Sequence, residues 1–534
     1  MVDMIVPGKV DVRYHLAAVD PGAGKTEALC AFLKAWKSLD FHPVAGALVV
    51  LQTRKEIEGC IHRSGLHPSD FAVMVEKGHD LNSRGLLRAG DSPVLLTTQE
   101  KLRHLCAGRA FADVDCLHFK GRPRALRIWD EAFLPAVPAA IRKDFIVQPY
   151  ADLRPHAPKA VAMLESFSDS LSVDTVGRVV EVPREVKATY TALTGLLGTA
   201  EAECFAVLKG LAGKSVAVVH GGSRGLFIAG AHRDLPADFA PALILDASGR
   251  VRETYRTMEA AGTLLRLPAA AQDYKRLRVH HWDRAGSRSA LSGVGARTEI
   301  LTAAAAVINA DNRRWLVVHP QDREGQSSLY DDLSGLCNDP SRLSWLHWGN
   351  HHGTNDYREI DRVMVLGVWD YPRPAYAALH MAAGGLPENA ASGGTMDAVK
   401  AGEARHNLLQ AVCRASVRKG LEGICGGCEV YIVAKLGKKA GDLLASTFPG
   451  SSMVPWVPAG LSLPDAVQRA ASAIERALMI PGVNRVAKGT IKAVLGLRSE
   501  DGLAKVLRQE PFRAWADRRG VEVTRRDFRW REAA

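Results

Sequence analysis

The chain has 534 residues, of which 47% are hydrophobic and 24% charged, which is ordinary for a globular protein and enough for about three or four domains. No apolar run reaches the roughly 18 residues that a membrane-spanning helix needs, and no basic-then-apolar segment at the start marks the chain for export. Nine scattered cysteines favour a reducing compartment over a disulfide framework, so we expect a cytoplasmic protein with no membrane partner. The net charge of +11 indicates a polyanionic partner, most simply nucleic acid.

A glycine-rich turn, PGAGKT at residues 21–26, lies between an apolar run and a helical pattern. Its glycines allow several backbone N–H groups to point at one anion, and the positive end of the following helix adds to that field. We expect Lys25 to reach the β- and γ-phosphates of a nucleotide and the Thr26 hydroxyl to bind Mg²⁺. Val19 stands where the usual pattern has its first glycine, and a plain glycine-rich turn is the alternative. The residues predicted to bind the nucleotide are Gly22, Ala23, Gly24, Lys25 and Thr26.

Three apolar segments further along predict strands of a buried parallel sheet, at 46–51, 94–96 and 126–129. Each segment ends in a polar cluster, and the carboxyl ends of parallel strands meet at the edge where open α/β sheets bind ligands. The third strand is followed by Asp130 and Glu131. We expect Asp130 to hold Mg²⁺ and Glu131 to polarise the attacking water.

The PGAGKT turn and the later DEAF sequence at 130–133 together resemble the nucleotide-binding lobe of superfamily 2 helicases of the DEAD/DEAH type. The resemblance implies ATP or another nucleoside triphosphate as cofactor, together with Mg²⁺. It also implies nucleic-acid contacts from the polar clusters after the intervening strands, although each threonine cluster alone could be an ordinary cap at a strand end. The adenine-reading glutamine of one branch is absent, since the first glutamine is Gln52. The residues that would contact nucleic acid are Thr53, Arg54, Thr97, Thr98 and Gln99.

Residues 135–215 contain long Ala/Leu/Glu/Lys stretches and predict a helical insertion in the first lobe. Strands are expected to resume at 215–220 and 226–228, and again at 242–245. The last of these ends in Asp-Ala-Ser, which resembles the family motif that links the acidic pair to movement of the second lobe. A plain strand-to-turn transition is the alternative. The expected coupling residues are Asp246 and Ser248.

A second α/β pattern begins near residue 265, with strands predicted at 279–282, 315–319 and 362–367. In the helicase family a polar pair before such a strand contacts the nucleic acid, and Thr354 and Asn355 would fill that role. Neighbouring histidines have no cysteine or acidic partner at ligand spacing, so we expect no metal beyond Mg²⁺.

Residues 407–418 resemble the QxxGRxxR-type helix that brings a cation from the second lobe to the phosphoryl group. Gln410, Arg414 and Arg418 would fill the pattern, with Cys413 in place of its glycine and the last arginine one residue late. On a helix, a spacing of four keeps both guanidinium groups on one face. We expect Arg414 to stabilise the transferring phosphoryl group, with Arg418 second; a basic helix facing solvent is the alternative.

The segment from 446 to 475 begins rich in Pro, Ser and Gly and is predicted to be a linker. Beyond it, small helices and a hairpin predict a winged-helix-like module over 476–534. Between 484 and 531 there are 13 Lys/Arg against 6 Asp/Glu, an excess of 7, which favours nucleic-acid binding over a basic cap that only packs on the rest. The arginines expected to contact nucleic acid include Arg508, Arg525 and Arg526.

The sequence therefore predicts an α/β protein with two tandem RecA-like parallel-sheet lobes, at 1–262 and 263–445, plus the helical insertion and the C-terminal module. We expect an NTP-dependent helicase or translocase that acts on nucleic acid, DNA rather than RNA, in the replication or transfer of a mobile element. A nucleotide-switched DNA-binding regulator without translocation and a DNA-packaging motor are the alternatives.

Overall fold

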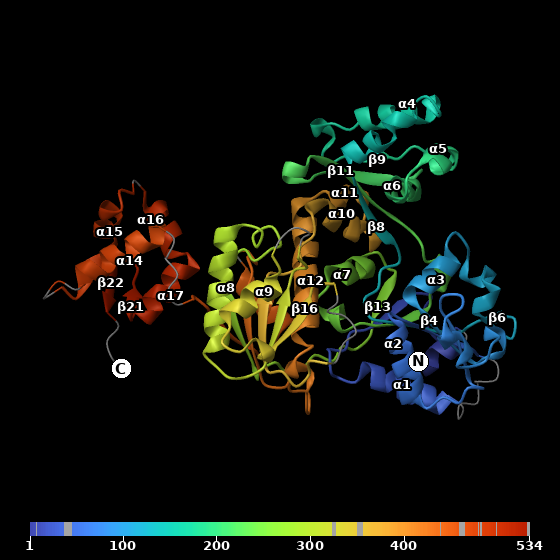
Figure 1. Ribbon diagram of the computed structural model, residues 1–534, viewed down its shortest axis with the longest axis horizontal. Helices are drawn as coiled ribbons and strands as arrows, with labels where there is room; N and C mark the ends of the chain where they lie inside the picture. The colour runs from blue at the N-terminus through green and yellow to red at the C-terminus, as the bar shows by residue number, and fades with distance from the viewer. Residues whose placement is uncertain are drawn as a thin grey trace.

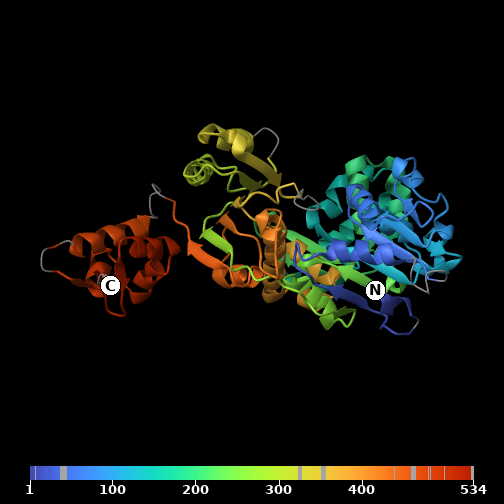
Figure 2. The same cartoon turned by 90° about the horizontal axis from the view of Figure 1, so that it is seen from below.

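The computed structural model describes residues 1–530, except 7, 37–44, 323–326, 350–355, 438, 459–464, 479, 481–482 and 498. The chain forms two parallel sheets, an antiparallel sheet inserted into the first lobe, and a C-terminal module (Figure 1). Turned by 90°, the molecule shows the module at one end, beside the second lobe (Figure 2). Among the described residues, no helix has both the length and the apolar character to cross a membrane.

The first lobe is built on a seven-stranded parallel sheet that is buried on both faces. Its strands are β1 (Tyr14–Ala17), β2 (Ala47–Leu51), β3 (Phe71–Met74), β4 (Val94–Thr98), β7 (Leu126–Asp130), β12 (Ala242–Leu245) and β13 (Leu264–Arg266), in the order β13-β1-β12-β7-β2-β4-β3. Alternate residues of β2 enter different cores: Val49 packs with Leu29, and Val50 packs with Trp129 on the other face. This burial on two sides explains the continuous apolar runs.

The helices of the first lobe follow its strands. They are α1 (Lys25–Ala35), α2 (Arg54–Ser64), α3 (Gln99–Cys106) and α7 (Glu253–Ala260), and a small hairpin joins β5 (His118–Phe119) to β6 (Arg122–Pro123). The helices α2 and α3 begin immediately after β2 and β4. Residues at these junctions therefore lie at the carboxyl edge of the sheet.

The second lobe is built on a six-stranded parallel sheet of order β16-β15-β17-β18-β14-β19. Its strands are β14 (Leu277–Trp282), β15 (Trp315–His319), β16 (Leu343–His347), β17 (Arg362–Leu366), β18 (Cys428–Val433) and β19 (Ser452–Pro455). Its helices are α8 (Val294–Asn309), α9 (Leu329–Leu336), α10 (Arg373–Ala382), α11 (Pro387–Ala390), α12 (Gly393–Val412) and α13 (Ala440–Thr447). The strand β19 lies inside the predicted linker, because residues 452–455 pair with β14 and complete the sheet.

The insertion differs from the prediction of a helical segment. It contains a four-stranded antiparallel sheet of order β8-β11-β10-β9 as well as helices. The strands expected at 215–220 and 226–228 belong to this sheet and not to the parallel one. Its elements are β8 (Val137–Arg142), α4 (Pro158–Asp169), β9 (Val179–Glu181), α5 (Val186–Leu193), α6 (Thr199–Leu211), β10 (Ser215–His220) and β11 (Leu226–His232).

The insertion packs on the second lobe, although the chain joins it to the first. One face of its sheet is covered by its own helices in a core that includes Phe205 and Val216. The other face contacts α10 and α11, where Val219 and Ala229 pack with Ala377 and Met396 (Figure 1). The insertion and this part of the second lobe therefore share a hydrophobic core.

The C-terminal module has its own core, which includes Ile474, Phe512 and Phe528. Its elements are α14 (Asp465–Leu478), β20 (Arg485–Ala487), α15 (Lys488–Val494), α16 (Glu500–Leu507), α17 (Glu510–Arg518), β21 (Val521–Val523) and β22 (Asp527–Trp530). The strands form an antiparallel sheet of order β20-β22-β21. Because α14 begins at Asp465 and supplies core residues, the module starts before the predicted boundary at 476.

Candidate active site

The glycine-rich turn has the backbone geometry of an anion-binding loop. Gly22 has φ +87° and Gly24 has φ +90°, a region that side chains other than glycine rarely adopt. Gly24 is the residue that precedes α1, so the loop leads directly into the helix N-terminus. The Nζ atom of Lys25 is buried and has no hydrogen-bond partner among the described residues. A buried ammonium without a partner fits a bound anion.

The acidic pair stands at the end of β7, opposite this loop. Asp130 is 5% exposed, and its Oδ1 atom is buried without a hydrogen-bond partner among the described residues. Burial and the neighbouring Glu131 raise the pKa of Asp130 to about 7, although Lys25 opposes the shift. Glu131 has φ +74°, a strained conformation for a non-glycine residue. A divalent cation would relieve the repulsion between these two carboxyl groups.

The second lobe reaches this site through the end of α12. The prediction that Arg414 and Arg418 share a helix face is wrong, because α12 ends at Val412. The chain leaves the helix there because the backbone N–H of Ser416 donates to Ile360, which draws the segment toward the second sheet. A short 3₁₀ turn, Ser416–Arg418, then carries the second arginine.

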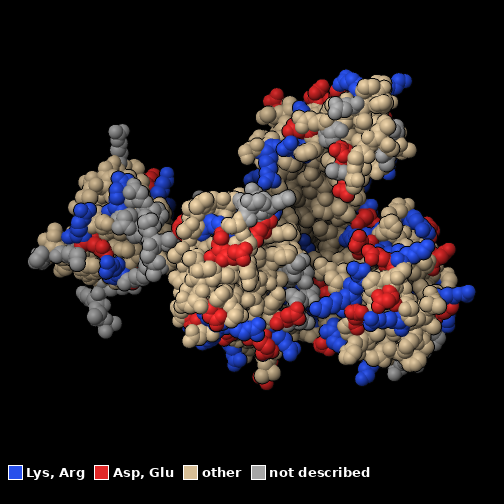
Figure 3. All heavy atoms as spheres, viewed as in Figure 1, with Lys and Arg blue, Asp and Glu red and all other residues tan. Residues whose placement is uncertain are grey.

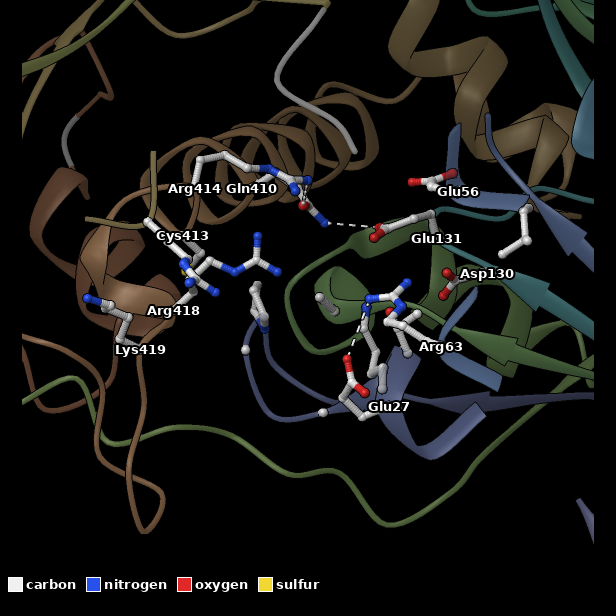
Figure 4. A pocket seen from close by; sticks show the side chains of 18 residues that line it. Glu27, Glu56, Arg63, Asp130, Glu131, Gln410, Cys413, Arg414, Arg418 and Lys419 are labelled. Atoms are coloured by element: carbon white, nitrogen blue, oxygen red, sulfur yellow. Dashed lines mark hydrogen bonds and ion pairs between the residues drawn. The ribbon is translucent and has the colours of Figure 1, made fainter. Parts of the chain in front are cut away.

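Both arginines nevertheless face the first lobe (Figure 4). Gln410 donates from Nε2 to Glu131 Oε2 over 3.5 Å and accepts at Oε1 from Arg414 over 3.1 Å. Burial lowers the pKa of Arg414, and burial together with Arg414 lowers the pKa of Arg418. An incoming polyanion would offset this cost of burying two neighbouring cations.

These groups line one cavity of about 410 Å³ between the two lobes. Four of the five residues predicted to bind nucleotide line it; Ala23 does not. The predicted Asp130, Glu131, Gln410, Arg414 and Arg418 line it as well. The wall also contains charged residues that no sequence pattern assigned to it: Glu27, Glu56, Arg63, Arg358 and Lys419.

Arg63 and Glu56 are the two residues of α2 among these. Arg63 lies in the last turn of α2 and contacts Glu27 of α1 over 3.4 Å. Glu56 caps the start of α2 through a hydrogen bond from the Thr53 backbone N–H, and burial raises its pKa. The capping pattern at 53–56 is visible in the sequence, but nothing in a single sequence places Arg63 beside the cavity.

The composition of the cavity suits a chain of phosphates together with a divalent cation. The loop N–H groups, Lys25 and two second-lobe arginines could hold the phosphates, and the unpartnered Asp130 oxygen and the Thr26 hydroxyl could hold the cation. Beyond this, the described residues contain no group of three or more His, Cys, Asp or Glu placed to hold a metal ion.

The predicted nucleic-acid residues of the first lobe lie at the carboxyl edge of its sheet, where their side chains have structural partners. Thr53 and Thr98 cap α2 and α3 by accepting from backbone N–H groups over 3.2 Å. Thr97 donates to the Met74 carbonyl over 2.6 Å, and Arg54 pairs with Glu76 over 3.1 Å. Gln99 instead donates to the Asp130 carbonyl over 2.7 Å, which ties this edge to the acidic pair.

The remaining nucleic-acid predictions fall elsewhere. Thr354 and Asn355 lie outside the described residues. Arg508 follows α16, and Arg525 and Arg526 form the turn between β21 and β22; all three are exposed on the C-terminal module.

The predicted coupling residues form a buried network. Ser248 donates to Asp246 from its N–H and its hydroxyl, over 2.8 and 2.7 Å. Tyr255 also donates to Asp246, over 2.6 Å, and its oxygen accepts from the backbone N–H of Phe133 over 3.0 Å. The strand end at Asp246 is thus connected to the segment that follows the acidic pair.

Two further cavities follow: the first adjoins the site, and the second adjoins the first through Trp369 and Tyr371. The first, of about 220 Å³, shares Glu131 with the site and is lined by Gln99, Arg252 and Glu403. The other, of about 530 Å³, lies between the β10–β11 turn of the insertion and the carboxyl edge of the second sheet. Its walls include Arg224, Arg288, Trp348, Trp369 and Tyr371.

No family model and no curated protein matches the sequence. Among solved structures, the chain is similar to an apo form of XPD, with 12% identity, a TM-score of 0.45, and coverage of 83% of this chain and 97% of that one. It is similar to Xpd4 of S. tokodaii at 11% identity and a TM-score of 0.44, covering 85% and 97% of the two chains. It is also similar to S. cerevisiae Dbp5 bound to RNA and ADP BeF3, at 11% identity and a TM-score of 0.34, covering 83% and 85%.

Proposed function

We propose that the chain hydrolyses a nucleoside triphosphate, ATP in the first instance, between its two parallel-sheet lobes and uses the cycle to move along nucleic acid. The observation that carries this proposal is the pairing of two buried, unpartnered atoms, Lys25 Nζ and Asp130 Oδ1, in one cavity. Across that cavity stand Arg414 and Arg418 of the second lobe. A cavity of this composition suits a phosphate chain with a divalent cation.

Each residue has a role that follows from its position. Lys25 and the loop N–H groups hold the phosphates, while Thr26 and Asp130 would hold Mg²⁺. When bound, the cation neutralises charge on the transferring phosphoryl group. Glu131 orients the attacking water, and Gln410 keeps that carboxylate in place from the opposite lobe.

Arg414 and Arg418 complete the site only when the two lobes are close. Arg414 supplies positive charge where it develops on the phosphoryl group, and Arg418 balances the remaining phosphate charge. Because these cations come from the second lobe, hydrolysis and release would favour different separations of the lobes. That alternation is the basis of stepping along a strand.

The nucleic-acid partner is supported by charge and by aromatic groups. The 530 Å³ cavity combines Arg224 and Arg288 with Trp369 and Tyr371, whose rings lie 5.5 Å apart. Arginine beside aromatic faces suits a single strand, since phosphates and bases are both accommodated. On its visible face the C-terminal module carries several Lys and Arg side chains (Figure 3). We infer that this module adds affinity for DNA.

The test is hydrolysis with and without nucleic acid, together with strand displacement, for the intact protein and for Lys25→Ala and Arg414→Ala. We expect DNA to stimulate hydrolysis, and both variants to lose at least about tenfold of the stimulated rate. Hydrolysis without any response to DNA or RNA would contradict a motor. Nucleotide-dependent DNA binding without strand displacement or translocation would favour the regulator instead.

A further inference from the structure

Two arginines that follow β12 reach from the first lobe into the second. Arg250 donates to the Ser446 and Thr447 carbonyls at the end of α13, over 2.7 and 3.0 Å. Arg252 forms a two-pronged ion pair with Glu403 of α12, from Nε to Oε1 over 2.7 Å and from the terminal nitrogen to Oε2 over 3.0 Å. The Arg252 and Glu403 side chains are only 8% and 3% exposed.

The helix α12 lies very close to the first lobe at this ion pair. A Cβ atom added at Gly402 would be 2.6 Å from the backbone nitrogen of Glu253, the first residue of α7. The helix therefore has almost no space to shift toward α7, and the ion pair holds it against moving away. A bidentate guanidinium–carboxylate pair also restrains sliding, because both hydrogen bonds need the same alignment.

The position of Glu403 along α12 links the pair to the active site. Gln410 follows Glu403 by seven residues, two helical turns, so both side chains lie on the face toward the first lobe. From its position two turns after Glu403, Gln410 contacts Glu131, and Arg414 contacts Gln410 in turn. A slide of α12 along its axis by the rise of one residue would move Gln410 by about 1.5 Å, although its contact with Glu131 is already as long as 3.5 Å.

We propose that Arg252 and Glu403 are positioning residues for hydrolysis. Their buried ion pair fixes the position of α12 along its axis, so that Gln410 and Arg414 lie beside the acidic pair. This inference rests on the proposed hydrolysis between the lobes. Neither residue lines the nucleotide cavity; both line the adjoining cavity of about 220 Å³. Their effect is therefore expected on the chemical step and not on nucleotide affinity.

The experiment compares Glu403→Gln with the wild type in single-turnover hydrolysis and in the binding of a non-hydrolysable ATP analogue. We expect kcat to fall about 10-fold to 100-fold, as for small misplacements of catalytic groups, while Kd changes by less than about threefold. The charge-swapped R252E/E403R protein should recover much of the rate. A purely structural defect would lower the melting temperature without this split between kcat and Kd.

The matched control is Arg266→Gln. Arg266 forms an equally two-pronged pair with Glu259 of α7, over 2.9 and 2.8 Å, but both partners belong to the first lobe. This variant should hydrolyse at the wild-type rate. In a protein that already carries Arg414→Ala, the Glu403→Gln change should lower the hydrolysis rate little further, because both changes remove the same contribution to that rate.

The outcomes separate the inference from the proposed function. A wild-type protein that neither binds nor hydrolyses nucleotide overturns both. Wild-type hydrolysis with a Glu403→Gln rate within about twofold overturns the positioning role alone, as does full additivity with Arg414→Ala. If Glu403→Gln does not fold, the double variant R252M/E403L replaces it, because two apolar side chains of similar size keep the packing. An unchanged kcat in that protein overturns the inference.

Discussion

Gly22 of the glycine-rich loop lies directly against Arg418 of the second lobe: a Cβ atom added to the glycine would be 2.2 Å from the Arg418 carbonyl oxygen. The loop that would hold the phosphates is therefore itself a point of contact between the lobes. Space around Gly24, two residues later, is open, with nothing within 4 Å of an added Cβ.

This difference predicts unequal effects for two alanine substitutions. Both glycines have φ near +90°, so each change costs about 1–2 kcal/mol of backbone strain. Gly22→Ala must also displace the second lobe, and we expect a lower melting temperature and a lower hydrolysis rate than for Gly24→Ala. Thermal unfolding of the nucleotide-free proteins measures the first effect. Equal melting temperatures for the two variants would mean that displacing the second lobe from Gly22 does not lower the free energy of unfolding.

Arg63 is predicted to contact the bound nucleotide, because its guanidinium lines the cavity beside Glu27. We expect Arg63→Ala to weaken binding of a fluorescent nucleotide about fivefold to tenfold, the effect of losing one charge-assisted contact. Lys55→Ala is the control, since Lys55 carries the same charge on the same helix but is exposed and does not line the cavity. Similar affinities for the two variants would exclude Arg63 from the site.

The raised pKa of Asp130 predicts that the stability of the folded protein depends on pH. Its folded pKa of about 7 lies above the unfolded value near 3.9, so the carboxyl group favours the folded state only while protonated. The nucleotide-free wild type should therefore lose stability as the pH rises from about 4 through 7. Each pKa unit corresponds to about 1.4 kcal/mol, which amounts to several degrees in melting temperature for the full shift.

The variant Asp130→Asn removes that titration. It should melt above the wild type at pH 8 and near it at pH 5, and the proposed metal-binding role of Asp130 predicts that it loses hydrolysis. Differential scanning calorimetry without nucleotide or Mg²⁺ measures both. A variant that is less stable than the wild type at pH 8 would contradict the burial of an unpaired charge at this position.

We expect a single strand of nucleic acid to bind in the cavity of about 530 Å³ between the insertion and the second sheet. Replacing Arg224 and Arg288 by glutamate should weaken binding of a labelled single strand and reduce the salt dependence of that binding, because two phosphate contacts are lost. Arg184→Glu is the control on the insertion. It lies at the opposite end of β10, beside Gly213, and is paired with Glu181. Equal losses for both proteins would indicate a general charge effect instead of a site.

The sequence was informative where local chemistry decides the structure. Continuous apolar runs in β2, β4 and β7 predicted buried parallel strands, and their polar ends predicted which residues would gather at one edge. The strand β8 carried no such signal, because Pro138 interrupts its pattern and is tolerated only since β8 is an edge strand. The three-residue β9 is too short for an alternating pattern to stand out.

Other features depend on contacts that no local pattern records. The end of α12 is set by the hydrogen bond from Ser416 to Ile360, two segments far apart in the chain. Arg63 reaches the cavity because α2 lies beside α1, where Glu27 meets it. For the same reason the predicted linker proved to contain β19, since only pairing with β14 makes residues 452–455 a strand.

The shared core between the insertion and α10 has a mechanical consequence. Among the residues that the structure describes, the first lobe meets the insertion at the two connections around Leu134 and Asp234, where Arg103 of α3 donates to both, whereas an apolar interface fastens the insertion to the second lobe. If the lobes rotate during the cycle, we expect the insertion to travel with the second lobe as one rigid arm, while the first lobe turns beneath it. Spin labels on the insertion should then keep their distance from α12 and change their distance from α3 when nucleotide binds. Contacts between a bound strand and the insertion would then stay unchanged, and only the contacts between that strand and the first lobe would change.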